Sequence, residues 1–413
     1  MATIVPFKAL RPQAQFAKQV ASRPYDVLNA REAKEEARGN PYSFLHITKP
    51  EIDLPEDMNS YAPEVYEKAK ENLQAYMQRD VLFRENKSCY YIYRLIMNGR
   101  SQTGLVCGSS VKDYESDVIK KHEFTRPEKE QDRINHIRIT GAQTGNVFLA
   151  YRDVEEVNVL IEKWKQEKSP IYDFVAEDGV QHSVWIVNDD ETIKTISALF
   201  KKKVPQTYIA DGHHRAASAA KVKEALGKEA TPGSMYFLTT LFPAGELEIM
   251  DYNRVVKDLN GLSVTQLLEA LQPHFHCELK GSEPCKPARL HEFGMYVDGN
   301  WYLLTAKEGS WTTDPIGVLD VSILSEKVLD PLLGIKDQRT DKRIDFVGGI
   351  RGLQELQKRV DSGEMKIAFS LYPVTMEQLF DIADSGNVMP PKSTWFEPKL
   401  RDGLLTHLIY ESI

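Results

Sequence analysis

Apolar positions in the first half of the chain follow two periods that alternate along the sequence. Helical spacing, with apolar residues three and four positions apart, covers residues 61–83 and 153–168. Compact runs rich in β-branched and aromatic residues lie at 89–97 and 182–187 and are typical of buried strands. Helices that alternate with strands in this way indicate a mixed α/β fold.

Residues 189–227 carry the clearest local signals. The predicted order is a helix opened by acids at 189–191, a strand at 204–210, a turn at Asp211 and Gly212, and an alanine-rich helix at 216–226. Gly227 then ends the second helix, because glycine is the usual residue after a helix C-terminus. A polar turn between a buried strand and a helix is also where an α/β protein commonly binds ligands.

The second half is patterned less regularly. A capped helix is expected at 263–275, a hairpin at 294–306 that turns at Asp298-Gly299, and further helices near 320–333 and 351–361. The last 50 residues predict a strand, a helix, a polar loop and a closing strand. With 413 residues, 42% of them hydrophobic, we expect two domains: an α/β core at 1–260 and a C-terminal α/β region at 261–413.

Charge and composition exclude several classes of protein. A formal net charge of −8 and a pI near 5.8 argue against a nucleic-acid-binding protein, which normally presents a basic surface. No apolar run is long enough to span a bilayer, and no secretory signal opens the chain. The four cysteines lack zinc-binding spacing and are expected to be reduced. We therefore expect a soluble cytoplasmic protein that binds neither membranes nor nucleic acid.

The polar residues at the predicted turn form the first candidate site. His213, His214 and Arg215 follow the turn, where the first helical N–H groups lack intrahelical acceptors and favour anions. Asp211 adds a carboxylate, which can hold Mg²⁺ or accept a proton. The alternative is an ordinary turn with Asp211 as an N-cap. Zinc is less favoured, because adjacent histidines project in different directions from a helix.

A second constellation lies upstream, where a carboxylate stands among cations and a hydroxyl. Glu123 follows Lys120, Lys121 and His122 and precedes Thr125 and Arg126. Asp132 and Arg133 lie further along the same polar stretch. Nearby cations lower the pKa of a carboxyl group whereas burial raises it, so Glu123 can be a base when it sits in a cleft. Taken alone, the stretch also fits a solvated run of charges.

A third candidate is the segment MPPKSTWFEPKL, in which prolines stiffen a loop. It offers cations and hydroxyls that suit phosphate oxygens: Lys392, Ser393, Thr394 and Lys399. The loop lacks the glycines of a Walker motif. An ordinary polar loop is the alternative.

Six segments together resemble the bacterial family known as the domain of unknown function 1015: PFKALRP, SRPYDV, NPYSFLHITKPEIDLP, KKHEFTRPEKEQDR, YIADGHHRAASA and MPPKSTWFEPKL. The resemblance covers nearly the whole chain. That family is grouped with the ParB and sulfiredoxin-like nucleotide-binding fold and with kinases that phosphorylate free L-serine. The marks shared with those kinases are a His-Glu pair, matched by His122 and Glu123, and an Asp-Gly-x-His-Arg turn, matched by Asp211, Gly212, His214 and Arg215.

The resemblance implies a function. Glu123 is expected to draw the proton from a hydroxyl, with His122 and Asp211 as further catalytic residues, while residues 211–215 hold nucleotide phosphates and Mg²⁺. The residues expected to bind the nucleotide or its phosphates also include Thr125, Arg133, Lys392, Ser393, Thr394 and Lys399. We therefore expect a kinase that transfers phosphate from ATP or ADP to a small hydroxyl metabolite, best represented by free L-serine. Two alternatives stay open: a nucleotide-sensing module of ParB type without turnover, and a metal-assisted hydrolase that uses Asp211, His213 and His214.

Overall fold

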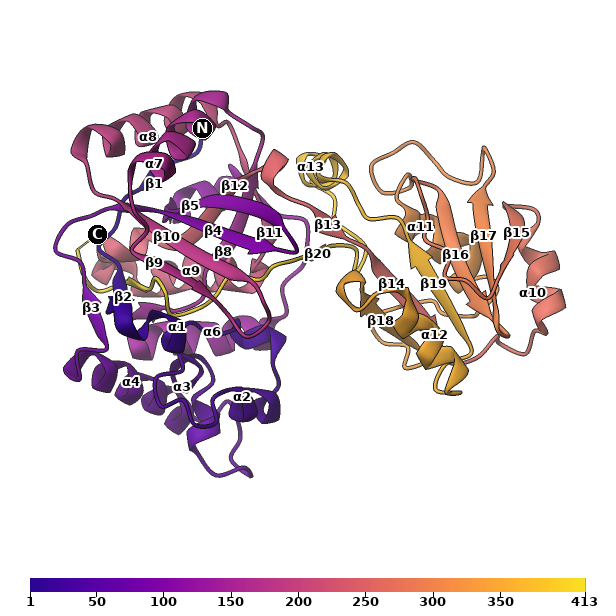
Figure 1. Cartoon of the computed structure of the whole chain (residues 1–413), viewed down its shortest axis with the longest axis horizontal. Coiled ribbons are helices and arrows are strands. Elements are labelled where there is room, and N and C mark those ends of the chain that lie inside the picture. Colours follow the sequence, from indigo (N-terminus) through magenta and orange to yellow (C-terminus); the bar gives the residue numbers. More distant parts are fainter. Residues whose placement is uncertain (413) are drawn as a thin grey trace. The chain divides into compact units, whose positions relative to one another are not determined.

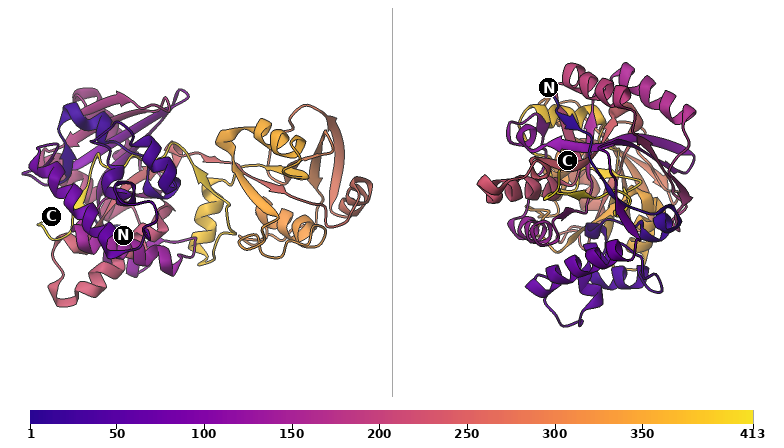
Figure 2. Two further views of the ribbon diagram at one scale, coloured as in Figure 1. Left: turned by 90° about the horizontal axis from the view of Figure 1, so that it is seen from below. Right: turned by 90° about the vertical axis from the view of Figure 1, so that its left-hand side faces the viewer.

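The computed structural model describes residues 1–412, which form two compact units (Figures 1 and 2). The first unit comprises Met1–Leu247 together with the chain from Pro398 onward, and the second is Glu248–Glu397. The expected boundary at residue 260 therefore lies inside the second unit. The chain returns to the first unit because a short C-terminal strand, β21 (His407–Leu408), pairs with β7 (Ala142–Gln143).

The first unit is built on a nine-stranded mixed sheet. Along its main path the strands are ordered β6 (Ile119–Lys120), β11 (Thr207–Asp211), β8 (Val147–Tyr151), β12 (Tyr236–Pro243), β5 (Arg100–Ser110), β4 (Tyr90–Met97), β10 (Gln181–Val187) and β9 (Tyr172–Val175), with β1 (Ile4–Val5) paired to β5. Two pairs, β6 with β11 and β8 with β12, are parallel, and the others are antiparallel. The predicted mixed α/β class is confirmed.

Helices cover both sides of this sheet. The longer ones are α4 (Pro63–Gln78), α6 (Pro127–Thr140), α7 (Glu155–Glu167), α8 (Asp190–Lys203) and α9 (His213–Leu226), and the shorter ones are α1 (Ala17–Val20), α2 (Ala30–Glu36), α3 (Leu45–Thr48) and α5 (Val111–Glu115). Figures 1 and 2 show α7 and α8 on one side and α2, α3 and α4 on the other. Tyr151 of β8 packs edge-on against Phe200 of α8, with ring centroids 5.2 Å apart, in the main core.

The strongest local signals of the sequence give the elements expected from them. Helix α8 begins where Asp189 accepts the backbone N–H of Thr192 at 2.8 Å, and its last turn holds Lys201, Lys202 and Lys203. Strand β5 was not predicted, because its sequence RSQTGLVCGSS has few β-branched residues. It is nonetheless buried, and a Cβ on Gly104 would lie 2.7 Å from the Thr240 side chain. Tertiary packing therefore determines this strand.

The second unit has a separate six-stranded antiparallel sheet. Its order is β15 (Phe275–Gly281), β17 (Asn300–Ala306), β16 (Glu292–Val297), β19 (Ile367–Leu371), β14 (Tyr252–Val256) and β18 (Ile344–Gly348). Its helices are α10 (Val264–Leu271), α11 (Asp320–Leu324), α12 (Leu353–Asp361) and α13 (Met376–Asp384), and β13 (Ile249–Met250) pairs with β20 (Trp395–Phe396). The predicted hairpin turns at Asp298 (φ 50°) and Gly299 (φ 76°).

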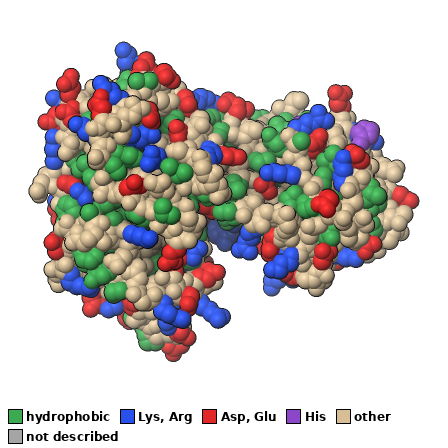
Figure 3. All heavy atoms as spheres, in the orientation of Figure 1, with side chains coloured by type: hydrophobic (Ala, Val, Ile, Leu, Met, Phe, Trp, Pro, Cys, Tyr) green, Lys and Arg blue, Asp and Glu red, His purple; other side chains and the backbone are tan. Residues whose placement is uncertain are grey.

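The described surface shows no single dominant charge on the face that Figure 3 draws. Lys and Arg side chains alternate there with Asp and Glu side chains in both units. Within residues 1–412, no helix is both long enough and apolar enough to cross a lipid bilayer.

Candidate functional site

Strand pairing brings the two upstream sequence candidates to one edge of the first sheet. Strands β6 and β11 are parallel, with Tyr208 opposite Lys120, so both end at the same edge. The segment 121–126 follows β6 and the segment 211–215 follows β11. Strand β8 runs antiparallel to β11 with Phe148 opposite Asp211, so the loop before β8 joins the same edge. Ligands commonly bind beyond the carboxyl ends of parallel strands.

The turn between β11 and α9 requires a glycine. Gly212 has φ 97°, and a Cβ there would lie 3.4 Å from the Val147 Cα. The backbone N–H of Ala216 bonds to the Gly212 carbonyl at 3.0 Å and forms the first turn of α9. The N–H groups of His213, His214 and Arg215 precede it and have no intrahelical acceptor. The predicted strand, turn and helix are therefore confirmed.

The two adjacent histidines are neutral, so Arg215 is the one positively charged side chain among the three residues that follow the turn. Burial lowers the pKa of His213 to about 3, and it also lowers that of His214. The Nε2 of His214 accepts the backbone N–H of Arg126 at 2.9 Å, and the Nε2 of His213 accepts that of His122 at 3.4 Å. Both rings therefore act as acceptors toward the upstream loop.

Glu123 lies on that loop next to His213. Its Oε2 is 3.7 Å from the Nδ1 of His213, and 45% of its side chain is exposed. The cations expected around it point elsewhere, since the Nζ of Lys120 binds Asp117 at 2.7 Å and the Nζ of Lys121 donates to the Tyr114 carbonyl at 2.7 Å. The carboxylate is thus open to solvent at the edge where β6 and β11 end.

His122, the residue before Glu123, is buried and does not face solvent. Its ring is 1% exposed, packs at 87° to the His213 ring with centroids 4.5 Å apart, and has no hydrogen-bond partner among the described residues. Burial and the neighbouring His213 lower its pKa to about 3. The His122 imidazole packs against the His213 ring. Because it is buried and has no hydrogen-bond partner among the described residues, it is not placed to contact a substrate, as the predicted catalytic role would require.

Replacing His122 with Phe tests whether this ring is buried in its neutral form. Because its folded pKa lies below the ordinary 6.5, the unfolded chain binds this proton first, and stability falls as the pH drops from 6.5 toward about 3. We expect His122→Phe to leave the unfolding free energy at pH 7 unchanged or higher. Between pH 7 and pH 5 the unfolding free energy of the variant should fall less steeply than that of wild type, by up to about 1.4 kcal/mol per pH unit. Urea titrations at pH 7, 6 and 5 measure both, and a slope equal to that of wild type contradicts the expectation.

The Arg215 side chain is buried, and it reaches Asp26, whose own side chain is 37% exposed. Its Nη2 donates to the Asp26 Oδ2 at 2.7 Å, and its Nη1 donates to the Asn146 carbonyl. The loop makes room for this side chain through Gly145, where a Cβ would lie 3.1 Å from the Arg215 Cδ. Tyr25 packs nearby, with its ring centroid 5.7 Å from the Arg215 guanidinium carbon.

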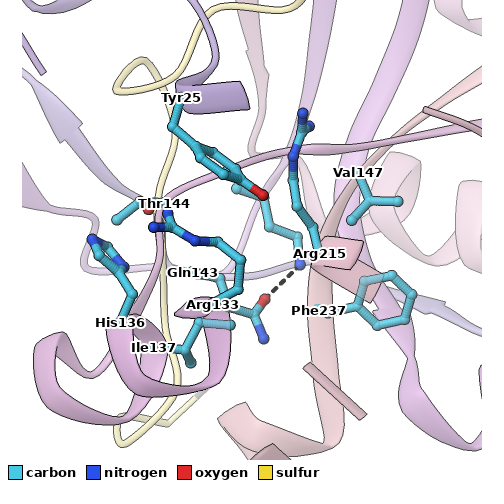
Figure 4. A pocket seen from close by; sticks show the side chains of 11 residues that line it. Tyr25, Arg133, His136, Ile137, Gln143, Thr144, Val147, Arg215 and Phe237 are labelled. Carbon is cyan, nitrogen blue, oxygen red and sulfur yellow. Dashed lines mark hydrogen bonds between the residues drawn. The ribbon is translucent and has the colours of Figure 1, made fainter. Parts of the chain in front are cut away.

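Arg133 lies on the other side of the same tyrosine. Its guanidinium carbon is 3.9 Å from the Tyr25 ring centroid, and its Nη2 is 2.8 Å from the Asp132 Oδ2. Figure 4 shows Arg133 and Arg215 around a cavity of about 20 Å³, room for one or two water molecules, lined by Tyr25, Arg133, His136, Ile137, Gln143, Thr144, Gly145, Val147, Arg215, Phe237 and Leu238. Two predicted phosphate-binding residues are thus brought together. The cavity between them is too small to hold a nucleotide in this conformation.

Asp211 is ionised and paired. The Nζ of Lys399, which the sequence placed in a separate loop, is 3.2 Å from the Asp211 Oδ2. Burial alone raises the pKa of Asp211, but Lys399 and Arg215 outweigh it and hold the pKa well below its usual range. Lys399 therefore contacts the site by pairing with the Asp211 carboxylate.

Asp402, three residues further along the same segment, escaped the sequence prediction. Its carboxyl group is 2% exposed, and neither oxygen has a well-formed hydrogen bond among the described residues. Burial raises its pKa to about 7, opposed by Arg215 and reinforced by Asp26. Its only sequence signal is an Asp-Gly pair, Asp402-Gly403, like the one at the start of α9.

Three of the other predicted phosphate ligands, Thr125, Ser393 and Lys392, have local contacts. The Thr125 hydroxyl donates to the Glu130 carboxylate, and the Ser393 hydroxyl is buried and donates to the Pro390 carbonyl at 2.6 Å. Lys392 has φ 56° and places its Nζ 5.8 Å from the Tyr252 ring centroid. Lys392, Ser393 and Thr394 belong to the second unit, whereas Lys399 belongs to the first.

The geometry does not fit the metal-assisted hydrolase. Within residues 1–412, no three His, Cys, Asp or Glu side chains converge to hold a metal ion. The three expected ligands instead face different partners: Asp211 faces Lys399, His213 faces Glu123, and His214 faces the Arg126 backbone. Only Asp211 keeps the character of a magnesium ligand, and one carboxylate suffices only where substrate phosphates supply further oxygens.

Comparison with known proteins gives one firm match. The model of the family described as "Protein of unknown function (DUF1015)" matches residues 4–322. A search of curated protein sequences finds no match.

Solved structures give only weak likenesses. A conserved hypothetical protein from Pyrococcus furiosus is 14% identical, with 74% of this chain and 95% of that chain covered and a TM-score of 0.34. A free serine kinase in complex with AMP is 14% identical, with 73% and 92% covered and a TM-score of 0.34. SbnI with a C-terminal truncation, from Staphylococcus aureus, is 12% identical, with 73% and 87% covered and a TM-score of 0.37. TM-scores this low carry no weight for the site.

Proposed function

This chain belongs to the family described as protein of unknown function (DUF1015), and we propose that it is a nucleotide-dependent phosphotransferase. The observation that carries the proposal is the position of Glu123, a solvent-open carboxylate beside the N-terminal turn of α9. Phosphoryl transfer requires an anion-binding element and a base close together, and little covalent chemistry from the protein. The shared edge of β6 and β11 supplies both.

Each group at this edge has a role in the proposed reaction. The N–H groups of His213, His214 and Arg215 bind phosphate oxygens at the positive end of the helix dipole. Glu123 accepts the proton of the substrate hydroxyl as the oxygen attacks. Asp211 is the residue that would hold Mg²⁺ together with the phosphates, and the ion would neutralise charge on the transferring group. Lys399 keeps Asp211 ionised.

We propose ATP or ADP as the phosphate donor and a small hydroxyl metabolite as the acceptor. Free L-serine is the first acceptor to test, because the sequence resemblance includes free-serine kinases. A nucleotide-sensing module without turnover is the second candidate. The cavity of about 20 Å³ beside Arg215 is too small for a nucleotide in this conformation, so it does not distinguish the two functions.

A product assay separates these functions. Purified protein is incubated with Mg²⁺, ATP or ADP, and L-serine or a pool of other hydroxyl metabolites, and products are followed by ³¹P NMR and mass spectrometry. A phosphorylated metabolite supports the phosphotransferase. Nucleotide binding without product favours the sensing module, and neither binding nor product overturns both.

Two glycines that flank α9 provide a matched test of the nucleotide site. Gly212 (φ 97°) begins the helix and Gly227 (φ 49°) ends it, so alanine at either position adds backbone strain of about 1–2 kcal/mol. Only a Cβ at Gly212 has neighbours within 4 Å, and only that end carries the proposed phosphate site. We expect Gly212→Ala to weaken nucleotide binding at least about tenfold, or about 1.4 kcal/mol, and Gly227→Ala to leave it unchanged. Isothermal titration calorimetry measures both, and equal affinities place the nucleotide elsewhere.

A further inference from the structure

The loop that carries Glu123 is tied to α9 at both of its ends. At one end the backbone N–H of His122 points to the Nε2 of His213 at 3.4 Å, and at the other the N–H of Arg126 donates to the Nε2 of His214 at 2.9 Å. Glu123, Phe124 and Thr125 lie between these two contacts. The two histidines are adjacent on the helix and project in different directions, which allows one loop to be held at two points.

The acceptor role fixes the state of each ring. An imidazole nitrogen that accepts a hydrogen bond carries no proton, so each neutral ring has its proton on Nδ1. In His213 this places the Nδ1–H toward the Glu123 Oε2, 3.7 Å away. The imidazole therefore presents a donor to the carboxylate and an acceptor to the backbone just before it.

Little else among the described contacts holds the centre of the loop. Phe124 is 79% exposed, and the Thr125 hydroxyl binds Glu130 of α6, outside the loop. Helix α9 itself is anchored to α6, since the Ser218 hydroxyl donates to the Glu130 carbonyl at 3.1 Å and Lys221 pairs with the Glu130 carboxylate, which also accepts the Thr125 hydroxyl. A fixed helix thus positions a loop that has few contacts of its own.

We propose that His213 and His214 are positioning residues that clamp the loop His122–Arg126 and so hold Glu123 over the N-terminal turn of α9. Their side chains bind the protein's own backbone instead of a ligand anion. The catalytic consequence rests on the proposed phosphotransferase function. The clamp itself does not, because it is a property of the free protein.

Paired substitutions test the clamp. His214→Leu removes the acceptor while keeping an apolar side chain of moderate size, and His214→Gln places an amide oxygen near the position of Nε2. His213→Leu and His213→Gln form the same pair at the other end, and His276→Leu, at an exposed position of the second unit, is the control. His214 is only half-buried, so its pair remains informative should the His213 variants fail to fold.

Hydrogen exchange of the free protein is the first measurement. We expect peptides that cover residues 119–130 to exchange at least about tenfold faster in His214→Leu than in wild type, with protection restored by His214→Gln. His276→Leu should exchange in this region like wild type. Unchanged exchange in both leucine variants overturns the clamp.

Kinetics are the second measurement, on the same variants with the donor and acceptor found in the product assay. We expect kcat to fall at least about tenfold in His214→Leu, to recover in His214→Gln, and KM for the nucleotide to stay within about twofold. A raised nucleotide KM with unchanged kcat overturns the proposal, because it makes the histidines phosphate ligands. If the loop exchanges faster in His214→Leu than in wild type, but the wild-type protein forms no phosphorylated product, the clamp is supported and the phosphotransferase function is rejected.

Discussion

Glu123→Gln is expected to abolish most phosphoryl transfer while leaving nucleotide binding intact. The amide keeps the shape of the side chain and its position near His213, but it cannot accept a proton from the substrate hydroxyl. Loss of a general base typically lowers the rate by about 10²–10⁴-fold. We expect kcat to fall by that factor and the Kd for the nucleotide to change less than about threefold. Single-turnover kinetics and calorimetry on the same preparation measure the two quantities.

Glu128→Gln is the matched control for this experiment. Glu128 lies five residues further along, exposed in the first turn of α6, and the same chemical change there removes a charge without touching the edge of the sheet. Its kcat should stay within about twofold of wild type. A Glu123→Gln enzyme as active as the Glu128→Gln enzyme removes Glu123 as the base. A parallel loss in both variants points to a general effect of charge.

The sequence predicted the parts of the site that depend on local structure. A β-rich run, an Asp-Gly pair and an alanine-rich run determine β11, the turn and α9 within about twenty residues, and short-range propensities act over that distance. The proximity of Glu123 to this turn could not come from propensity. It follows from the parallel pairing of β6 with β11, which joins residues about 90 positions apart. Only the family resemblance anticipated it.

Protonation states lay beyond prediction because they depend on burial. From the sequence, two consecutive histidines next to a helix N-terminus suggest side chains that help to attract an anion. In the structure the loop at 122–126 covers them, and desolvation keeps them neutral. The same holds for Asp402, whose raised pKa comes from the enclosure of a C-terminal segment within the first unit. In both cases the chemistry is determined by a distant segment that covers the group.

The two sides of the α9 N-terminus therefore differ in chemistry. On the side of His213, a solvent-open carboxylate is held by neutral acceptors, an arrangement suited to proton transfer. On the side of Arg215, two buried guanidinium groups line a cavity of about 20 Å³. Arg133 pairs with the buried Asp132 and Arg215 with the exposed Asp26, and these contacts are structural. We propose that catalysis takes place on the side of His213. On the side of Arg215 we expect substitutions to change stability most.

Arg215→Ala is expected to destabilise the first unit by about 3–5 kcal/mol, the usual cost of removing one partner from a buried ionic network. The loss removes the larger of the two cationic influences, Arg215 and Arg133, that oppose the raised pKa of the buried Asp402 carboxyl. Asp402 has a folded pKa of about 7, above its unfolded value, so it favours folding at acidic pH, and this contribution is lost as the pH rises through 7. Removal of Arg215 raises that pKa further, so the destabilisation should be larger at pH 8 than at pH 5.5.

A double-mutant cycle assigns this effect to the pair. Asp402→Asn in the Arg215→Ala background removes the stranded charge, so it should recover a substantial part of the lost stability at pH 8 and little at pH 5.5. Arg38→Ala, at a side chain that is 74% exposed and pairs with Glu35, should change stability by less than about 0.5 kcal/mol. Urea unfolding followed at both pH values measures the cycle. If Arg215→Ala costs the same at both and Asp402→Asn rescues neither, the Arg215 effect arises from its contacts with Asp26 and the Asn146 carbonyl alone, and Asp402 has no electrostatic part in this corner of the fold.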